Sequence, residues 1–297
     1  MAFWQTRFGR EGVKYLFIIP AFAFFLIFLL IPAMQSIYYS FFQWTGLGKP
    51  VWTGITNYIR AFKDEIFRLS FINNILYIMG TFVVEVGFGL LAALILNRKY
   101  PLFGLFRVMF FTPVVLSMVA AGLLWNFVYD PNFGVLNAIL KSIGLSSVTR
   151  AWLGDPSVAL IAVTVVSGWK YAGFYMMIFY AALQRIPQEL YEAARLDGAS
   201  WWTRITKVTL PLLRESVVLS FLICVTGGFS AFAVFYTMTN GQPYHRTEIM
   251  TTWIIKQAFD RNNMGYAAAL TVFLVVLVLA FSIVYLKRTG KKKVIEY

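Results

Sequence analysis

Residues 262–286 read NNMGYAAALTVFLVVLVLAFSIVYL and contain no charged side chain. A helix that crosses the hydrocarbon core of a bilayer needs about 20 predominantly apolar residues, and this run is longer than that. Inside lipid the backbone must satisfy its own hydrogen bonds, which a helix does without help from other segments. The segment therefore predicts a membrane-spanning helix and places the chain among membrane proteins.

Five apolar segments upstream have the same character. They lie at residues 14–37, 71–97, 105–129, 157–184 and 212–239. Glu85 interrupts the second segment and Lys170 the fourth. The first contains the uncharged run 15–34, which exceeds the apolar core of a signal peptide, so we expect a retained signal-anchor helix. Together the segments predict an all-α membrane protein with six transmembrane helices.

The composition excludes several other classes of protein. Of the residues, 59% are hydrophobic and 13% are charged, against roughly 25% charged in soluble domains. The single cysteine, Cys224, allows no internal disulfide, and the single histidine, His245, has no second His or Cys nearby, so no metal site is predicted. The net charge of +13 would suggest nucleic acid on a soluble protein. Here the basic residues flank apolar segments, so no nucleic-acid partner is predicted.

The distribution of Lys and Arg indicates which loops face the cytoplasm. Basic residues are enriched in cytoplasmic loops, and the two sides of the predicted bundle carry 16 and nine of the 26. The richer side contains both termini, so we expect both ends to be cytoplasmic. The expected organisation is a cytoplasmic N-terminal segment 1–13, a transmembrane domain 14–286 and a basic cytoplasmic tail 287–297.

Two loops on the opposite side predict short amphipathic helices. In the loop 38–70, apolar residues from Ile55 to Ile66 recur at helical spacing. The loop 130–156 opens with the turn sequence DPNFG and continues with a second amphipathic stretch. Such helices suit either anchoring in the bilayer interface or capping a pore and receiving a partner.

Residues 184–214, QRIPQELYEAARLDGASWWTRITKVTLPLLR, predict a helix–turn–helix on the side of the termini. Pro187 suits the first helical position, and Glu189 complements the positive N-terminus of the helix. Gly198 suits a left-handed cap at the end of this helix, and Ser200 can cap a second short helix. From these residues alone, the loop either connects two spans or couples the bundle mechanically to a cytoplasmic partner.

The spacing of small residues in this loop resembles a known pattern. Glu192-Ala193-Ala194, three residues, Gly198, nine residues, Val208, one residue and Leu210-Pro211 are similar to the EAA loop of bacterial ABC-importer permeases, which has Ile in place of Val208. The stretches FFTP, GLLW, NFGVLN, GWKY, AALQRIP and TNGQP resemble the carbohydrate subclass of that family, in which Gly is usual at the position of Gln242. The chain is similar to the first permease of the pair in maltose-type and glycerol-phosphate-type importers.

The resemblance implies the type I ABC importer permease fold, a location in the bacterial cytoplasmic (inner) membrane, and import of a mono- or oligosaccharide. The implied partners are a second permease subunit, two ATPase subunits, an extracytoplasmic solute-binding protein, the sugar and the lipid membrane. ATP and Mg would be bound by the ATPase subunits, so no cofactor is expected in this chain. Within the coupling loop 185–211, the implied ATPase-coupling residues are Glu192, Ala193, Ala194, Arg195, Asp197 and Gly198.

The resemblance also implies a solute pathway along the fourth and fifth predicted spans. The positions that resemble the sugar-contacting set of the maltose permeases are Ser167, Lys170, Tyr171, Phe174, Cys224, Gly228 and Ala231. The first four are spaced to share one face of a helix. A charged residue inside a span is a functional candidate by default. Lys170 therefore contacts solute or forms a structural ion pair, with Glu85 or with the partner permease, and Glu85 carries the same two interpretations.

Other functions remain as alternatives at this point. The chain has no Gly-x4-Gly-Lys-Ser/Thr phosphate loop and no predicted catalytic residues, so ATP hydrolysis belongs to another chain. Lys170 keeps open a non-sugar polar solute such as glycerol phosphate. An ion-coupled secondary transporter typically has inverted repeats and several embedded acids, and here only Glu85 qualifies. A membrane-embedded enzyme would need paired acids or histidines.

Overall fold

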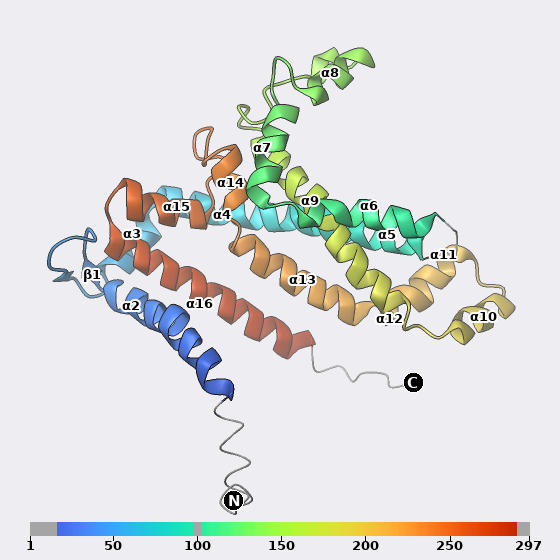
Figure 1. Ribbon diagram of the computed structural model, residues 1–297, viewed down its shortest axis with the longest axis horizontal. Coiled ribbons are helices and arrows are strands. Elements are labelled where there is room, and N and C mark those ends of the chain that lie inside the picture. The colour runs from blue at the N-terminus through green and yellow to red at the C-terminus, as the bar shows by residue number, and fades with distance from the viewer. Residues whose placement is uncertain (1–16, 98–101, 290–297) are drawn as a thin grey trace, which may run out of the picture. The chain divides into compact units, whose positions relative to one another are not determined.

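The computed structural model describes residues 17–97 and 102–289, most of which are helical (Figure 1). The chain divides into two units, the first formed by residues 1–63 and 254–275 and the second by 64–253 and 276–297. The predicted N-terminal segment 1–13 and residues 290–297 of the predicted tail lie outside the described part.

The first unit combines helices with a small two-stranded sheet. Its elements are the helix Phe17–Tyr39, which ends in α2 (Ile31–Tyr39), then β1 (Phe42–Gln43), β2 (Val51–Trp52) and α3 (Thr56–Lys63). The strands are antiparallel, with Phe42 opposite Trp52. The buried Asn57 side chain donates hydrogen bonds to the carbonyl oxygens of Ser40 and Phe42 at 2.9 and 2.8 Å. This amide fixes α3 against the turn after α2.

The second unit contains most of the helices. They are α4 (Glu65–Thr81), α5 (Phe88–Leu96), α6 (Phe103–Val115), α7 (Met118–Val128), α8 (Val135–Ser142), α9 (Ala159–Leu183), α10 (Gln188–Leu196), α11 (Trp201–Arg204), α12 (Leu210–Leu212), α13 (Arg214–Phe229) and α14 (Ala233–Met238). A π-helical segment, Phe82–Gly87, joins α4 to α5, and another, Ile205–Thr209, joins α11 to α12. Two helices, α15 (Met250–Ile255) and α16 (Met264–Thr289), have residues in both units.

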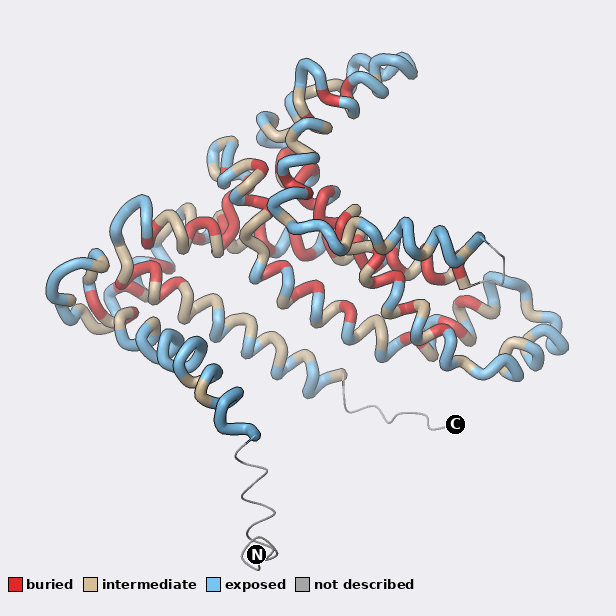
Figure 2. The backbone as a smooth tube through the Cα atoms, in the orientation of Figure 1, coloured by how far each residue is buried: buried red, intermediate tan, exposed pale blue. Residues whose placement is uncertain are grey.

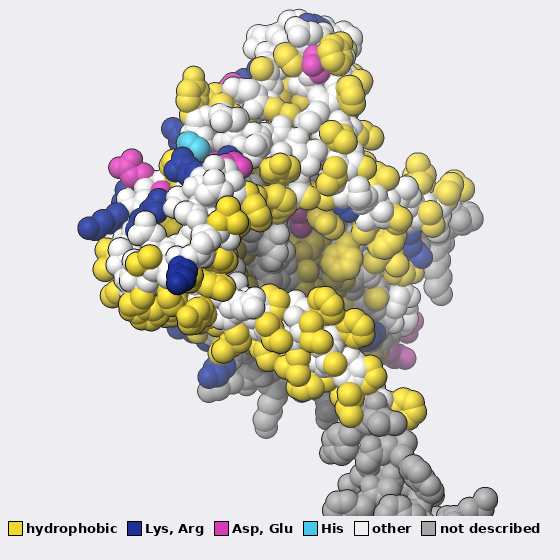
Figure 3. All heavy atoms as spheres, turned by 60° about the vertical axis from the view of Figure 1, so that its left-hand side comes forward, with side chains coloured by type: hydrophobic (Ala, Val, Ile, Leu, Met, Phe, Trp, Pro, Cys, Tyr) yellow, Lys and Arg dark blue, Asp and Glu magenta, His cyan; other side chains and the backbone are white. Residues whose placement is uncertain are grey.

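Four helices among the described residues are long and apolar enough to cross a membrane by themselves. They are Phe17–Tyr39, Glu65–Leu96, Ala159–Leu183 and Met264–Thr289. Two bent pairs qualify when each is counted as one span, Phe103–Val115 with Met118–Val128 and Trp201–Leu212 with Arg214–Phe229. Hydrophobic side chains cover much of the face shown in Figure 3, as expected for helices that contact lipid. The described part thus has four to six candidate spans, against the six predicted.

The predicted third span, 105–129, is wrong as a single straight helix. Its two halves, α6 and α7, meet at a bend of 100°. Leu116 has an extended backbone with ψ of 145°, and the Ser117 hydroxyl accepts a hydrogen bond from the Ala120 N–H at 3.1 Å. Ser117 thereby caps α7, while Pro113 near the end of α6 lacks a backbone donor. The bend results from these local features.

The predicted fifth span, 212–239, is also wrong as a continuous helix. Residues 230–232 separate α13 from α14. The buried Asn74 of α4 compensates for part of the interruption, since its side-chain nitrogen donates to the Gly228 carbonyl oxygen at 3.0 Å and its oxygen accepts from the Met250 N–H at 2.8 Å. A broken helix at membrane depth is tolerated where side chains of neighbouring helices satisfy the freed backbone groups.

The helix α9 lies at the centre of the second unit and packs against α4, α5, α6 and α13. Glycines permit the closest approaches, since a Cβ atom at Gly173 would clash with the Phe110 backbone and one at Gly89 would clash with the α9 backbone. Small residues let helix backbones approach in this way within membranes. Figure 2 shows buried residues along α9, whereas α8 is mostly exposed.

The short helices predicted in the loops 38–70 and 130–156 are confirmed, with shifted boundaries. Residues 56–63 form α3, and residues 135–142 form α8. Ile66 belongs to the next helix instead, because the Asp64 carboxylate accepts hydrogen bonds from the N–H groups of Ile66 and Phe67 at 3.0 and 3.1 Å and starts α4 there. The Asp64 N-cap therefore divides the apolar stretch 55–66 between two helices, α3 and α4.

Candidate functional site

The first candidate site is the loop between α9 and α13, which forms a helical hairpin. Pro187 has an extended backbone, with ψ of 137°, and immediately precedes α10. The prediction that Pro187 is the first helical residue is therefore wrong by one position, and Gln188 takes that place. Glu189 lies in the first turn, as predicted, where its carboxylate favours the positive end of the helix.

The predicted glycine cap of α10 is confirmed. Gly198 has a φ of +75°, a left-handed conformation that side chains other than glycine rarely adopt. The Gly198 N–H donates to the Arg195 carbonyl oxygen at 3.0 Å, and the Ala199 N–H donates to that of Ala194 at 2.9 Å. These two bonds form a Schellman motif, which satisfies the last carbonyl groups of α10 and reverses the chain direction.

Side chains fix the second half of the hairpin. The Ser200 hydroxyl accepts a hydrogen bond from the Thr203 N–H at 3.1 Å, which confirms Ser200 as the predicted cap of α11. The hydroxyl groups of Tyr191 and Thr209 lie 3.1 Å apart and join α10 to the segment that leads into α12 and α13. We call residues 188–204 the coupling hairpin.

The coupling hairpin presents most of the predicted coupling residues to solvent. Glu192, Ala193, Arg195, Asp197 and Gly198 are exposed, and Ala194 is half-buried. Three further apolar side chains are exposed on the same hairpin, namely Leu196 (90%), Trp201 (51%) and Trp202 (65%). The sequence-based set missed them, although large apolar residues in a polar loop are a signal for a contact surface. The hairpin combines an apolar contact area with charges of both signs.

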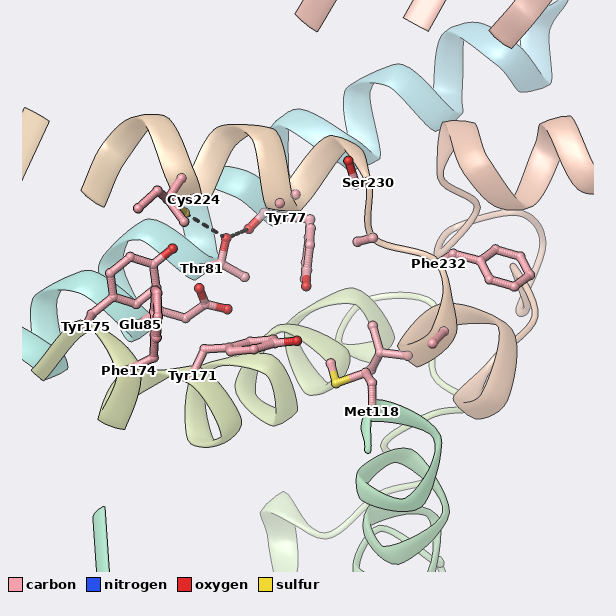
Figure 4. Close-up of a pocket in the computed structure, with 16 residues that line it drawn as sticks. Tyr77, Thr81, Glu85, Met118, Tyr171, Phe174, Tyr175, Cys224, Ser230 and Phe232 are labelled. Atoms are coloured by element: carbon pink, nitrogen blue, oxygen red, sulfur yellow. Dashed lines mark hydrogen bonds between the residues drawn. The ribbon is translucent and has the colours of Figure 1, made fainter. Parts of the chain in front are cut away.

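The second candidate site is a cavity of about 550 Å³ in the second unit (Figure 4). Its wall comes from α4, the segment Phe82–Gly87, α9, α13, the break before α14 and the start of α7. Aromatic and aliphatic side chains make up most of the wall, with a few polar groups between them. A concave, mostly apolar site with a small number of placed polar groups is typical of small-molecule binding.

Five of the seven predicted pathway residues line this cavity. They are Tyr171, Phe174, Cys224, Gly228 and Ala231. Tyr171 and Phe174 contribute aromatic rings from α9, whereas the three residues around the end of α13 are small and leave room. The structure therefore brings the predicted positions of the fourth and fifth spans together around one chamber.

The other two predicted pathway residues lie behind the wall. The hydroxyl groups of Ser167 and Tyr77 lie 2.7 Å apart, and Tyr77 is the residue that faces the cavity. The Lys170 ammonium group donates to the Val114 carbonyl oxygen on α6 at 2.9 Å and lies 4.5 Å from the centre of the Tyr171 ring. Within the described residues no ion pair joins Lys170 to Glu85, so that structural pairing is wrong.

The cavity wall also contains residues that the sequence-based pathway omitted. Tyr77, Thr81 and Glu85 are spaced at intervals of four along α4 and the π-helical segment, and all three line the cavity. This spacing places them on one face of a helix. It was visible in the sequence, but nothing in the sequence showed that this face meets α9 and α13.

Comparisons with known proteins place the chain in a family. Residues 85–288 match the family described as binding-protein-dependent transport system inner membrane component. The chain is 38% identical, over 95% of its length and 98% of the relative's, to the probable ABC transporter permease YurN of Bacillus subtilis (strain 168). It is 32% identical, over 95% of both chains, to the trehalose/maltose transport system permease MalF of Thermococcus litoralis.

A solved structure shares the fold. A chain of a bacterial ABC transporter involved in the import of the acidic polysaccharide alginate superposes with a TM-score of 0.84 at 24% identity, over 96% of this chain and 97% of that one. The family predicted from the EAA-like spacing is confirmed, and the ion-coupled and enzymatic alternatives are not supported. The chain belongs to the inner membrane components of binding-protein-dependent transport systems, the permease subunits of ABC importers.

Proposed function

We propose that this chain is the permease subunit of an ATP-driven importer for sugars. Relatives at 29–34% identity are named as permeases for diacetylchitobiose, trehalose and maltose, and arabinooligosaccharides, which supports a carbohydrate as the solute. The aromatic wall of the cavity suits such a solute, because sugar rings stack on aromatic faces while hydroxyl groups bond to polar side chains. ATP and Mg would be bound by separate ATPase subunits.

The observation that carries this proposal is the covalent continuity between the coupling hairpin and the cavity. The hairpin leads through residues 205–213 into α13, and Cys224 and Gly228 of α13 line the cavity. The contact between the Tyr191 and Thr209 hydroxyls ties the first helix of the hairpin to the same connection. A displacement of the hairpin would thus be transmitted to the cavity wall through a short helical path.

The assembled importer would contain two permeases, two ATPases and an extracytoplasmic solute-binding protein. Each bent pair, α6 with α7 and 201–212 with α13, would count as one span, which gives six spans with both termini cytoplasmic. The excess of Lys and Arg in the loops on that side supports this orientation. The coupling hairpin would then face the ATPase, with Glu192, Ala193, Ala194, Arg195, Asp197 and Gly198 at the contact.

The ATPase would drive transport through this contact. Closure of the two ATPases on ATP would draw the two coupling hairpins together and turn the helix bundles from inward-facing to outward-facing. The cavity would then receive solute from the binding protein and later release it to the cytoplasm. Within the wall, Tyr171 and Phe174 would contact solute directly. Ser167 would orient Tyr77, and Lys170 would hold α9 on α6 behind the Tyr171 ring.

Matched glycine substitutions test the proposal. Gly198 ends α10 and Gly144 ends α8, both at positive φ, and an added Cβ would meet no atom within 4 Å at either position. Asp tolerates this conformation better than most residues, so Gly198→Asp and Gly144→Asp carry a similar, modest strain. In the reconstituted importer we expect Gly198→Asp to abolish uptake of its sugar and the ATP hydrolysis stimulated by binding protein, with normal membrane insertion.

Gly144→Asp should leave both activities near the wild-type level. Wild-type uptake in Gly198→Asp would contradict the coupling role. Equal losses in the two variants would show that cap strain, and not the contact with the ATPase, causes the defect.

A further inference from the structure

Glu85 is an acid in the wall of the cavity, and no basic residue that the structure describes forms an ion pair with it. The residue is 6% exposed, and in Figure 4 its carboxyl group points into the space between Thr81 and Tyr171. Within residues 17–97 and 102–289, no side chain donates a hydrogen bond to this carboxyl group and no Lys or Arg forms an ion pair with it. A structural acid at this depth would ordinarily have such a partner.

Lys170, the basic residue inside the fourth predicted span, is not among the residues that line the cavity. The Lys170 ammonium group donates to the Val114 carbonyl oxygen and lies over the Tyr171 ring. None of the described residues that line the cavity is Lys, Arg or His. The wall therefore carries one acid and no compensating cation.

The Thr81 and Tyr77 hydroxyl groups, on the same helical face as Glu85, are bonded within the protein. The Thr81 hydroxyl lies within hydrogen-bond distance of the carbonyl oxygens of Tyr77 and Ile78, at 3.0 and 3.1 Å, and of the Cys224 sulfur, at 3.5 Å. The Tyr77 hydroxyl is shared with Ser167 at 2.7 Å. The wall also carries the hydroxyl groups of Tyr171, Tyr175 and Ser230, which can exchange hydrogen bonds with the hydroxyl groups of a neutral solute.

We propose that Glu85 is a solute-facing residue and sets the charge selectivity of this chain's side of the passage. The chamber accepts neutral polyhydroxylated solutes or amino sugars and disfavours solutes with carboxylate or phosphate groups. This inference rests on the proposed function, because it takes the cavity as part of the transport pathway. The inference narrows the transported solutes to neutral or cationic sugars and excludes glycerol phosphate.

Cys224 provides a reporter for the charge of the chamber, because it is the only cysteine of the chain and lines the same cavity. A methanethiosulfonate reagent reacts when the Cys224 thiolate attacks the sulfenyl sulfur. A disulfide forms between Cys224 and the reagent's thiol group, and methanesulfinate leaves with the electron pair. The probes are the cationic 2-(trimethylammonium)ethyl and the anionic 2-sulfonatoethyl reagents. Because both react with the same thiolate, the ratio of their rates is independent of the thiol's ionisation.

The experiment uses the assembled importer without ATP and without solute, at one alkaline pH for all variants, because the thiolate is the reacting species. Modification of the peptide that contains Cys224 is followed by mass spectrometry, and each rate is divided by the reagent's rate with free cysteine. We expect the cationic reagent to be favoured in the wild type. Glu85→Gln should reduce this normalised preference about tenfold, because an acid attracts the cation and repels the anion.

Two further variants separate the chamber charge from other effects. Glu85→Asp keeps the acid and should keep most of the preference, whereas Glu215→Gln removes an exposed acid at the start of α13 and should leave it unchanged. A wild-type preference for the anion, an unchanged ratio in Glu85→Gln, or no reaction with either reagent would overturn the proposal. A wild-type preference for the anion overturns the proposal even if Glu85→Gln fails to assemble. Because the reaction needs no ATP, its result is independent of the coupling test with Gly198→Asp.

Discussion

The two short helices α8 and α10 end in the same way and lead into different parts of the molecule. At the end of α8, the N–H groups of Gly144 and Leu145 donate to the carbonyl oxygens of Lys141 and Leu140 at 3.1 and 2.8 Å, which is the same Schellman motif as at Gly198. The loop after α8 returns to α9, whereas the loop after α10 continues into α13 and the cavity wall. The same cap gives both helices the same turn. The two turns are connected to different helices, so a movement of each turn would displace a different part of the molecule.

The exposed surfaces of the two helices differ as well. The exposed residues on and after α8 include the apolar side chains Val135, Ile139 and Ile143, as expected for a helix at a membrane interface. On α10 the exposed residues are mainly small or charged, with Leu196 as the apolar exception. A small, mixed surface suits a protein contact that must form closely and in one orientation.

After the paired glycine substitutions, the largest difference between the two helices is expected when an acid replaces the exposed leucine at the end of each one, Leu196 of α10 and Leu145 after α8. Leu196→Glu should lower ATP hydrolysis stimulated by binding protein about tenfold, because a buried apolar contact with the ATPase would be replaced by an unpaired charge. Leu145→Glu adds the same charge beside Gly144 and should change the stimulated rate by less than about twofold. Equal effects of the two substitutions would remove the distinction between the helices.

A change in the α8 loop should reduce stability without affecting coupling. The buried Asn137 side chain donates to the carbonyl oxygens of Pro131 and Arg150 at 3.3 and 3.0 Å and accepts from the Trp152 indole N–H at 2.8 Å. Asn137→Ala should cost about 2–3 kcal/mol of local stability, at about 1 kcal/mol for each lost bond. The measurements are the midpoint of thermal unfolding and the ATP hydrolysed per solute imported. A normal midpoint together with uncoupled hydrolysis would contradict this assignment.

The smallest effect is expected at Asp155, also in the α8 loop. Hydrogen bonds from the Ser157 hydroxyl and N–H lower the pKa of Asp155, and Arg150 at 3.6 Å adds to this. The resulting stabilisation is present above the ordinary pKa of an aspartate and is lost as the pH falls through the lowered value. Ser157→Ala should raise the pKa of Asp155, which carbon NMR of labelled Asp carboxyl groups would detect, and uptake near neutral pH should not change. A lower or unmoved pKa would contradict the assigned cause.

The turn after α10 was predictable because it depends on a few neighbouring residues. Gly198 and Ser200 lie within three positions of each other, and their types alone specify a left-handed cap followed by a new helix start. The breaks in the third and fifth predicted spans were not predictable in this way, because apolar composition continues through them. Asn74, which satisfies the backbone at the second break, lies 154 positions from Gly228 in the sequence.

The two candidate sites differ in the same way, because one is built from neighbouring residues and the other from distant ones. The coupling hairpin is a continuous stretch, so its residues could be named from spacing and resemblance. The cavity is built from distant helices, and only the positions on α9 and around the end of α13 could be carried over. Lys170 was placed in the pathway by resemblance to the maltose permeases, and the cost of a charge in a span made it a functional candidate, yet its ammonium group reaches a carbonyl on α6. Glu85 shares its helical face with Tyr77 and Thr81, but only packing shows where that face points.

Site-directed photocross-linking tests most directly whether the coupling hairpin, and not the α8 loop, contacts the ATPase. In a chain with Cys224→Ser, a benzophenone maleimide is attached at Ala193→Cys on α10 or at Ala138→Cys on α8, both exposed positions. We predict a covalent adduct with the ATPase subunit from position 193 and none from position 138. No ATPase adduct from position 193, or equal adducts from both positions, would contradict the coupling role of the hairpin.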